Sequence, residues 1–266
     1  MKLFISADIE GTCGICSWEE TEPGGTGYER FARQMTLEVA EVCRAALDSG
    51  RVEELLIKDA HSSARNLIPD ILPEEVRIFR GWQGAPGGMM AGAASWADAA
   101  AMTGYHSAAS TDGNPLAHTS NRQNHYVKIN GRIASEFLIN AYAAAYYGIP
   151  VIFLSGDEAL CESAREICPN IETVSVSEGA GGGSISVHPR KALAMIRQGM
   201  QRALERDLDE YRIRIPEHFV VEIEFRELGK AQKGSYYPGV IRSGSRGVVF
   251  ETEDYYEALR FLFFVL

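Results

Sequence analysis

Two acidic side chains stand two residues apart near the start of the chain, where Asp8 and Glu10 follow the apolar residues 3–5. The apolar run predicts a short buried strand, and Gly11 permits a sharp turn after it. Side chains two residues apart leave an extended backbone on the same face. Carboxylates held that close repel each other unless a cation lies between them. The pair is therefore a candidate metal site, with solvated loop acids as the alternative.

Two histidines occupy a similar place in the chain. His61 and His106 each come shortly after a short apolar or small-residue run that predicts a buried strand. If these strands neighbour the first one in a parallel sheet, their carboxyl ends meet at one edge, where chemistry gathers in α/β proteins. Each histidine alone is also compatible with a surface or hydrogen-bonded role. Their repeated position after a strand favours convergence with the acidic pair.

A set of carboxylates and imidazoles without cysteine is typical of Zn²⁺, or a similar ion, in a hydrolytic site. Two acids and two histidines exceed the needs of one catalytic zinc, which points to two metals that share a bridging carboxylate. Glu136 lies at the start of a predicted helix and is a candidate fifth ligand. An acid in the first helical turn also complements the helix dipole, so this position alone does not decide its role.

The five cysteines are odd in number and scattered, which argues against a disulfide framework. Cys13 and Cys16 form a C-x-x-C motif, which occurs in redox and zinc sites. A structural zinc would need a second close pair, and the sequence does not supply one. We expect two ordinary thiols near the surface of a loop.

Predicted strands and helices alternate over the first 175 residues, which indicates an α/β fold with a mainly parallel sheet. After about Val176, the pattern changes to strands of a second, smaller sheet with helices. We therefore expect an α/β metal-binding catalytic domain over residues 1–176 and a smaller α+β domain over residues 177–266. Asn130-Gly131 predicts a hairpin turn.

The overall charge and hydropathy narrow the function classes. The net charge of −10 argues against a nucleic-acid partner, because no basic stripe is available for phosphates. No apolar run reaches the roughly 18 residues of a membrane helix, and the start of the chain lacks the apolar region of a signal peptide. We expect a cytoplasmic protein without a membrane partner.

Five motifs in fixed order carry a resemblance to a known family. They are Ser6-Ala7-Asp8-Ile9-Glu10-Gly11, Asp59-Ala60-His61-Ser62, Gly104-Tyr105-His106, Ala117-His118-Thr119, and Asn130-Gly131 leading to Glu136. Together they resemble the M55 family of zinc D-aminopeptidases, the DppA-type enzymes associated with dipeptide transport. The resemblance extends from Met1 to about residue 260.

The resemblance implies a site, an activity and an assembly. It implies that His118 is the catalytic histidine, that Asp8 bridges two zinc ions, and that the substrates are short peptides or amides with an N-terminal D-residue of the D-Ala type. It also implies a three-layer α/β domain with a smaller C-terminal α+β domain, and a ring-shaped homo-oligomer. The implied zinc ligands are Asp8, Glu10, His61, His106 and Glu136.

Two other functions compete with this one. The protein could be a dizinc amidase or peptidase for another small substrate, which a panel of L- and D-aminoacyl amides would separate from a D-aminopeptidase. It could also be a non-catalytic, metal-bearing protein that binds peptides as the partner of an importer. A complete ligand set with His118 nearby argues against this last function.

Overall fold

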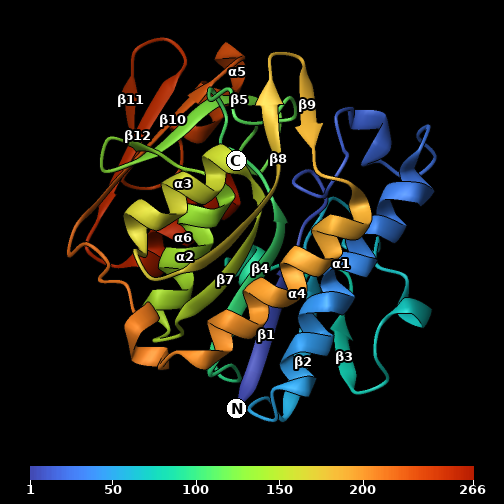
Figure 1. Cartoon of the computed structure of the whole chain (residues 1–266). Coiled ribbons are helices and arrows are strands. Elements are labelled where there is room, and N and C mark those ends of the chain that lie inside the picture. The colour runs from blue at the N-terminus through green and yellow to red at the C-terminus, as the bar shows by residue number, and fades with distance from the viewer.

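The computed structural model describes residues 1–266 and contains a large, mainly parallel sheet at its centre (Figure 1). Its strands are β1 (Lys2–Ala7), β2 (Glu54–Asp59), β3 (Val76–Phe79), β4 (Ala99–Tyr105), β7 (Val151–Asp157), β8 (Glu172–Ala180) and β9 (Gly183–Ser186). The spatial order is β3-β2-β1-β4-β7-β8-β9. Every neighbouring pair is parallel except β8 and β9. The mainly parallel sheet predicted from the sequence is confirmed.

Helices cover both faces of this sheet and complete three layers (Figure 1). One face carries α1 (Tyr28–Asp48) and α4 (Pro189–Glu205), and the other carries α2 (Glu136–Tyr146) and α3 (Glu158–Ile167). In α1, buried Phe31, Met35, Val39 and Val42 recur at helical spacing, so one side of the helix faces the sheet. No helix is both long and apolar enough to cross a bilayer.

A second sheet is antiparallel and lies beside the first (Figure 1). Its strands, in spatial order, are β11 (Ile241–Ser243), β12 (Gly247–Thr252), β10 (Phe219–Phe225), β5 (Asn124–Ile129) and β6 (Arg132–Ile133). Strand β10 alternates buried and half-buried residues, as a strand with one covered face does. The β5–β6 turn confirms the predicted hairpin, because Asn130 and Gly131 both take positive φ.

The remaining elements are short 3₁₀ helices and two helices of the C-terminal part. The short helices are η1 (Trp18–Glu20), η2 (Pro69–Ile71), η3 (Gly88–Met90) and η4 (Leu208–Tyr211). Helices α5 (Leu228–Gly234) and α6 (Tyr255–Val265) pack on the second sheet, and α6 also packs against α2. Helix α6 therefore connects the second sheet to α2, and α2 begins with Glu136.

The two sheets do not divide the chain at a single position. The expected boundary after residue 176 falls inside β8, and β9 and α4 also belong to the parallel sheet and its covering layer. In the other direction, β5 and β6 belong to the second sheet, where Val127 pairs with Ile223 of β10. A change of local pattern along the sequence does not reveal such long-range strand pairing.

Candidate metal centre

The strands that precede the candidate ligands are neighbours. Strand β1 lies between β2 and β4, in parallel register with both. Asp8 and Glu10 follow β1, His61 follows β2, and His106 follows β4, so all four leave the same edge of the sheet. The expected convergence of these four residues is confirmed.

Two glycine positions allow the turn after β1 to lie directly on the end of β4. Gly104 has a φ of 66°, and a Cβ atom there would come 2.2 Å from the carbonyl oxygen of Asp8. A Cβ atom on Gly11 would come 1.7 Å from the carbonyl oxygen of Tyr105. The backbone N–H of Gly11 instead donates to the Gly104 carbonyl at 2.8 Å. This close approach places the acidic pair beside His106.

His61 faces both acids with one ring nitrogen. Its Nδ1 lies 3.0 Å from Glu10 Oε2 and 3.3 Å from Asp8 Oδ1. Its Nε2 lies 2.8 Å from the carbonyl oxygen of Thr21, and a carbonyl only accepts, so Nε2 carries the proton. In the neutral ring, the form that binds a metal, Nδ1 is therefore the atom with the lone pair, and it faces the carboxylates.

Two residues that we did not predict fix the loop that carries His61. The Asp59 carboxylate, at the end of β2, accepts the backbone N–H groups of Asn66 and Leu67. The Asn66 side chain donates both to Asp59 and to the carbonyl oxygen of His61, the latter at 2.7 Å. Asp59 is visible in the sequence at the end of a predicted strand, but its partners become neighbours only in the folded loop.

His118 joins the same cluster from the loop between β4 and β5. Its ring stacks on His106, with centroids 4.3 Å apart and planes 4° from parallel. The Nδ1 atoms donate to the carbonyl oxygens of Ser107 (for His106) and Leu116 (for His118), each at 2.9 Å. Both Nε2 atoms face Glu136 Oε1, at 3.6 Å for His106 and 3.7 Å for His118. Glu136 and His118 therefore both lie in the predicted site.

The donor atoms fit a bound cation. Asp8 Oδ2, Glu10 Oε2 and His106 Nε2 are buried and have no hydrogen-bond partner. Buried polar atoms are nearly always paired, so converging unpaired acceptors indicate a site for a positive ion. Each of the three histidines is also held by a backbone carbonyl through its other nitrogen, as metal-binding histidines usually are. Imidazole and carboxylate donors suit zinc.

The charges of the metal-free cluster are strongly coupled. Burial, followed by repulsion from Glu10, raises the pKa of Asp8 well above its usual value. Burial would also raise the pKa of Glu10, but His61 outweighs it and holds that pKa well below its usual value. Burial would lower the pKa values of His61 and His106, yet the carboxylates raise them to about 11 and about 10. Without a cation, His61, His106 and Asp8 therefore hold protons, which a bound cation would displace.

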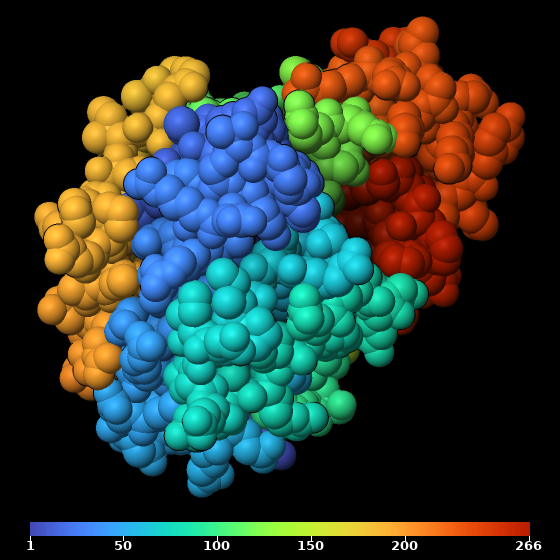
Figure 2. Space-filling model, turned by 90° about the vertical axis from the view of Figure 1, so that its right-hand side faces the viewer, coloured from blue at the N-terminus to red at the C-terminus, as the bar shows by residue number.

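A cavity of about 630 Å³ opens above the cluster and reaches the surface (Figure 2). Figure 2 looks onto the hollow where the loop after β1 (blue), the segment after β2 (cyan), the loop before β5 (green) and α6 (red) meet. Trp82 lines one wall, and its indole N–H donates to the Ser62 carbonyl at 2.7 Å. The buried ammonium of Lys58 lies 4.2 Å from the Trp82 ring and donates to two backbone carbonyls.

Arg122 lines the cavity without an acidic partner. The Arg122 guanidinium lies 4.3 Å from the Trp18 ring, which meets the His118 ring edge-on at 5.1 Å. Arg122 forms no ion pair and is the only lysine or arginine among the residues that line the cavity. It is thus free to meet an anionic group that enters.

The C-x-x-C motif lies outside the cluster and forms no disulfide. The expectation of two thiols near the surface holds for Cys16, which is exposed, but is wrong for Cys13, which is buried. The backbone N–H of Cys13 donates to Glu38 on α1, and its thiol donates to the Val187 carbonyl. Burial raises the pKa of Cys13 to about 12, which makes it a poor nucleophile.

Comparisons with known proteins agree with this geometry. The model of the peptidase M55 family, described as D-aminopeptidase, matches residues 1–264. A D-aminopeptidase of Bacillus subtilis (strain 168) is 31% identical over 260 residues, which cover 97% of this chain and 94% of the relative. A solved structure described as the Zn-dependent D-aminopeptidase DppA from Bacillus subtilis, a self-compartmentalizing protease, is similar with a TM-score of 0.90 and 29% identity, over 100% of this chain and 96% of that one. The resemblance inferred from the five motifs is confirmed, and the chain belongs to the M55 peptidase family.

Proposed function

We propose that the protein is a zinc-dependent aminopeptidase that hydrolyses short peptides or amides with an N-terminal D-residue. The observation that carries this proposal is the buried cluster of carboxylates and histidines, in which Asp8 Oδ2, Glu10 Oε2 and His106 Nε2 have no hydrogen-bond partner. Membership of the M55 family supports the reaction, and the similar solved structure is described as Zn-dependent. An open cavity of about 630 Å³ leaves room for a short peptide over the cluster.

The ligand atoms divide into two sets around Asp8, which supports a two-zinc centre. Asp8 Oδ1 faces His61 at 3.3 Å, and Asp8 Oδ2 faces His106 at 3.6 Å. Glu10 lies on the His61 side at 3.0 Å, and Glu136 lies on the His106 side at 3.6 Å. In this arrangement Asp8 would bridge the ions, and each ion would have one further carboxylate and one histidine.

The chemistry combines the bound ions with His118. Bound Zn²⁺ supplies a Lewis acid and lowers the pKa of a water molecule towards about 7. The Nδ1–H of His118 is held by the Leu116 carbonyl, so Nε2 has a free lone pair that faces the cluster. The imidazole ring of His118 is held in place because it stacks on His106 and meets the Trp18 ring edge-on. Nε2 is thus placed to take a proton when water adds to the peptide carbonyl and to return it to the departing amine.

A panel of amides tests the proposal directly. Zinc-loaded protein is expected to hydrolyse D-alanine amide, to leave L-alanine amide nearly untouched, and to lose activity after chelation. Equal turnover of the D- and L-amides would favour the alternative of a dizinc amidase for other small substrates. Stabilisation by a peptide without turnover of any amide would favour the non-catalytic binding protein.

We also propose that the protein assembles into a ring-shaped homo-oligomer. The description of the similar structure as a self-compartmentalizing protease supports assembly. Large apolar side chains are exposed on the C-terminal elements, among them Leu228, Tyr236, Ile241 and Phe264. Monomers rarely leave so many apolar side chains of one region in water. Analytical ultracentrifugation measures the mass in solution, and a monomer at micromolar concentration would contradict assembly.

A further inference from the structure

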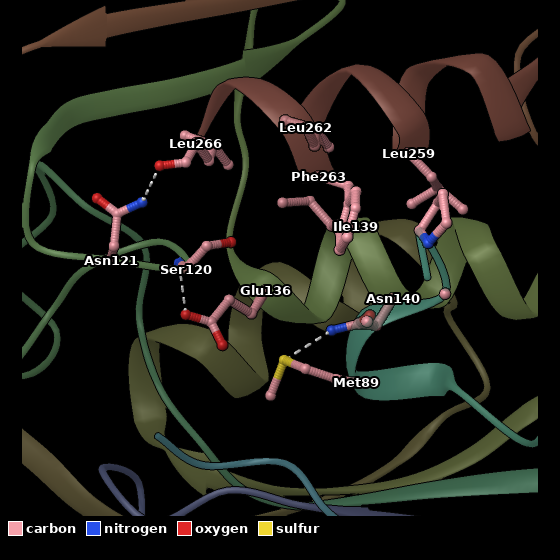
Figure 3. Close-up of a pocket in the computed structure, with 13 residues that line it drawn as sticks. Met89, Ser120, Asn121, Glu136, Ile139, Asn140, Leu259, Leu262, Phe263 and Leu266 are labelled. Atoms are coloured by element: carbon pink, nitrogen blue, oxygen red, sulfur yellow. Dashed lines mark hydrogen bonds between the residues drawn. The ribbon is translucent and has the colours of Figure 1, made fainter. Parts of the chain in front are cut away.

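A smaller cavity of about 240 Å³ adjoins the metal centre (Figure 3). It lies between α6 and α2, with the η3 segment closing one side. It shares Met89, Ser120, Glu136 and Phe263 with the larger cavity, so the two meet at the cluster. The smaller cavity is therefore a side chamber of the candidate active site.

This side chamber is polar at one end and apolar at the other. At the polar end, Glu136 Oε1 accepts the backbone N–H of Ser120 at 2.7 Å and faces the two stacked histidines. Figure 3 shows this carboxylate on one side, with the apolar side chains of α6 and Ile139 gathered above it. Most of the apolar wall comes from Ile139, Leu259, Leu262, Phe263 and Leu266.

Hydrogen bonds fix the walls of the side chamber. The Asn121 side chain donates to the carbonyl oxygen of Leu266 at 3.1 Å, which ties the end of α6 to the loop that carries His118. The Asn140 amide donates to the Met89 sulfur at 3.1 Å and ties α2 to η3. These polar groups are occupied with one another. The only charged side chain that lines the chamber is Glu136.

We propose that the side chamber binds the side chain of the substrate's N-terminal residue and that this residue is apolar and larger than alanine. This inference rests on the proposed aminopeptidase function. When the scissile carbonyl lies at the metal centre, the side chain starts one bond away, on the adjacent carbon. An apolar chamber that opens beside Glu136 is where that side chain would go.

The volume sets the size of side chain that fits. A dry cavity of about 150 Å³ lined by aliphatic and aromatic residues holds benzene. The side chamber is open at its polar end and has about 240 Å³, so by volume a leucine or phenylalanine side chain fits within it. An alanine methyl group would leave most of the apolar wall uncovered. Burial of each added methylene on the apolar wall is favourable, which favours the larger residues.

Amides of D-alanine, D-leucine and D-phenylalanine test the inference. The wild type is expected to show kcat/KM values about 10-fold or more higher for the D-leucine and D-phenylalanine amides than for the D-alanine amide. Phe263→Ala removes one wall and is expected to reduce this preference about 10-fold. Phe264→Ala is the matched control, because its neighbouring ring on α6 does not line the chamber; the preference should stay unchanged.

A binding measurement separates failure of this inference from failure of the proposed function. D-phenylalaninol and D-alaninol keep the amine and the side chain but have no amide to hydrolyse. D-phenylalaninol should raise the melting temperature of the zinc-loaded wild type more than D-alaninol does, and Phe263→Ala, but not Phe264→Ala, should lose the difference. Phe263 is 45% exposed and Phe264 63%, so both variants are expected to fold, and circular dichroism checks this.

Two results would overturn the inference. If D-alanine amide is the best substrate and Phe263→Ala does not change the preference, the chamber does not hold the side chain, although the proposed function stands. If the two amino alcohols stabilise the protein equally, the inference fails even where no amide is hydrolysed. Absence of hydrolysis together with a Phe263-dependent shift by D-phenylalaninol would reject the peptidase and retain the chamber.

Discussion

Asp8 and Asp157 are both buried aspartates at the carboxyl edge of the parallel sheet, yet their surroundings differ. Asp157 ends β7 and accepts the N–H and the hydroxyl of Ser107 at 2.7 and 2.5 Å, and also the backbone N–H of Leu160 at 2.9 Å. Asp8 accepts only the N–H of Ile9, and its Oδ2 has no partner. A buried carboxylate whose oxygens meet donors holds the fold together. A buried carboxylate with an unpartnered oxygen beside other carboxylates, as at Asp8, indicates a cation site.

The largest effect is expected on kcat and comes from His118, which lies in the same cluster as Asp8. His118→Ala should lower kcat for a D-aminoacyl amide by roughly 10²–10⁴-fold, because it removes the group proposed to move the proton. Zinc content should hold, since the five proposed ligand residues remain. Steady-state kinetics with metal analysis of the same preparation checks both. Loss of zinc in this variant would show that His118 is a ligand and that its assigned role is wrong.

Removal of the structural aspartate should act on stability instead. Asp157→Ala leaves the Ser107 groups and the first turn of α3 without their acceptor, and it should lower the free energy of unfolding by about 3 kcal/mol. Urea denaturation measures this change. Zinc bound per folded chain should equal that of the wild type. A variant that keeps its stability but loses zinc would erase the distinction between the two aspartates.

Glu38 on α1 shares features with both aspartates, because one of its carboxylate oxygens meets donors, as in Asp157, and the other has no partner, as in Asp8. One carboxylate oxygen accepts the Cys13 N–H and the Gln34 amide at 3.0 Å each, and the other is buried without a partner. Burial raises the pKa of Glu38 from 4.5 to about 7. The folded state therefore binds this proton more tightly than the unfolded state, and the associated stability is lost as pH rises from about 4.5 to about 7.

The variant Glu38→Gln keeps the acceptor and removes the charge. It should be more stable than the wild type at pH 8 by about 3 kcal/mol and about equally stable at pH 4.5, because the wild-type carboxyl is then protonated. Thermal denaturation across this pH range, with zinc held constant, measures the difference. A difference that does not change with pH would mean that Glu38 stays ionised in its buried site.

The smallest predicted effect is at Arg122, a cation that differs from Lys58 in its partners. Lys58 is buried against carbonyl oxygens, whereas Arg122 forms no ion pair in the cavity. Arg122→Ala should raise KM for D-Ala-D-Ala about 10-fold, because a charge-assisted contact with the substrate carboxylate is lost. KM for D-alanine amide, which has no carboxylate, should change less than about 2-fold. Equal changes for both substrates would assign Arg122 a structural role.

Much of the candidate metal centre could be predicted because most of its residues directly follow a short apolar run in the sequence. Short apolar runs followed by Asp8, His61 or His106 predict ligands at strand ends, and the parallel sheet brings them together. The structural acids Asp59 and Asp157 could not be separated from the proposed ligands by sequence, since they end strands in the same way. Their donors lie on other segments, and only the fold shows that they are satisfied.

Other features depend on contacts that the sequence pattern does not contain. His118 lies in a loop without periodicity, so the sequence pattern left its role open, and its assignment as the catalytic histidine came from the family resemblance. The buried position of Cys13 depends on Glu38 and Val187, which are distant in the chain. The membership of β5 in the second sheet depends on pairing with β10, about a hundred residues later. Such contacts leave no local signal.

The difference between the two aspartates can be measured as zinc content of the wild type, Asp8→Asn and Asp157→Asn. We expect about two zinc ions per chain in the wild type, a loss of both in Asp8→Asn, and no loss in the folded fraction of Asp157→Asn. Asparagine preserves the shape of each side chain, so the comparison isolates the charge. Little zinc in the wild type after incubation with the metal, or full zinc in Asp8→Asn, would contradict a bridged centre at the end of β1.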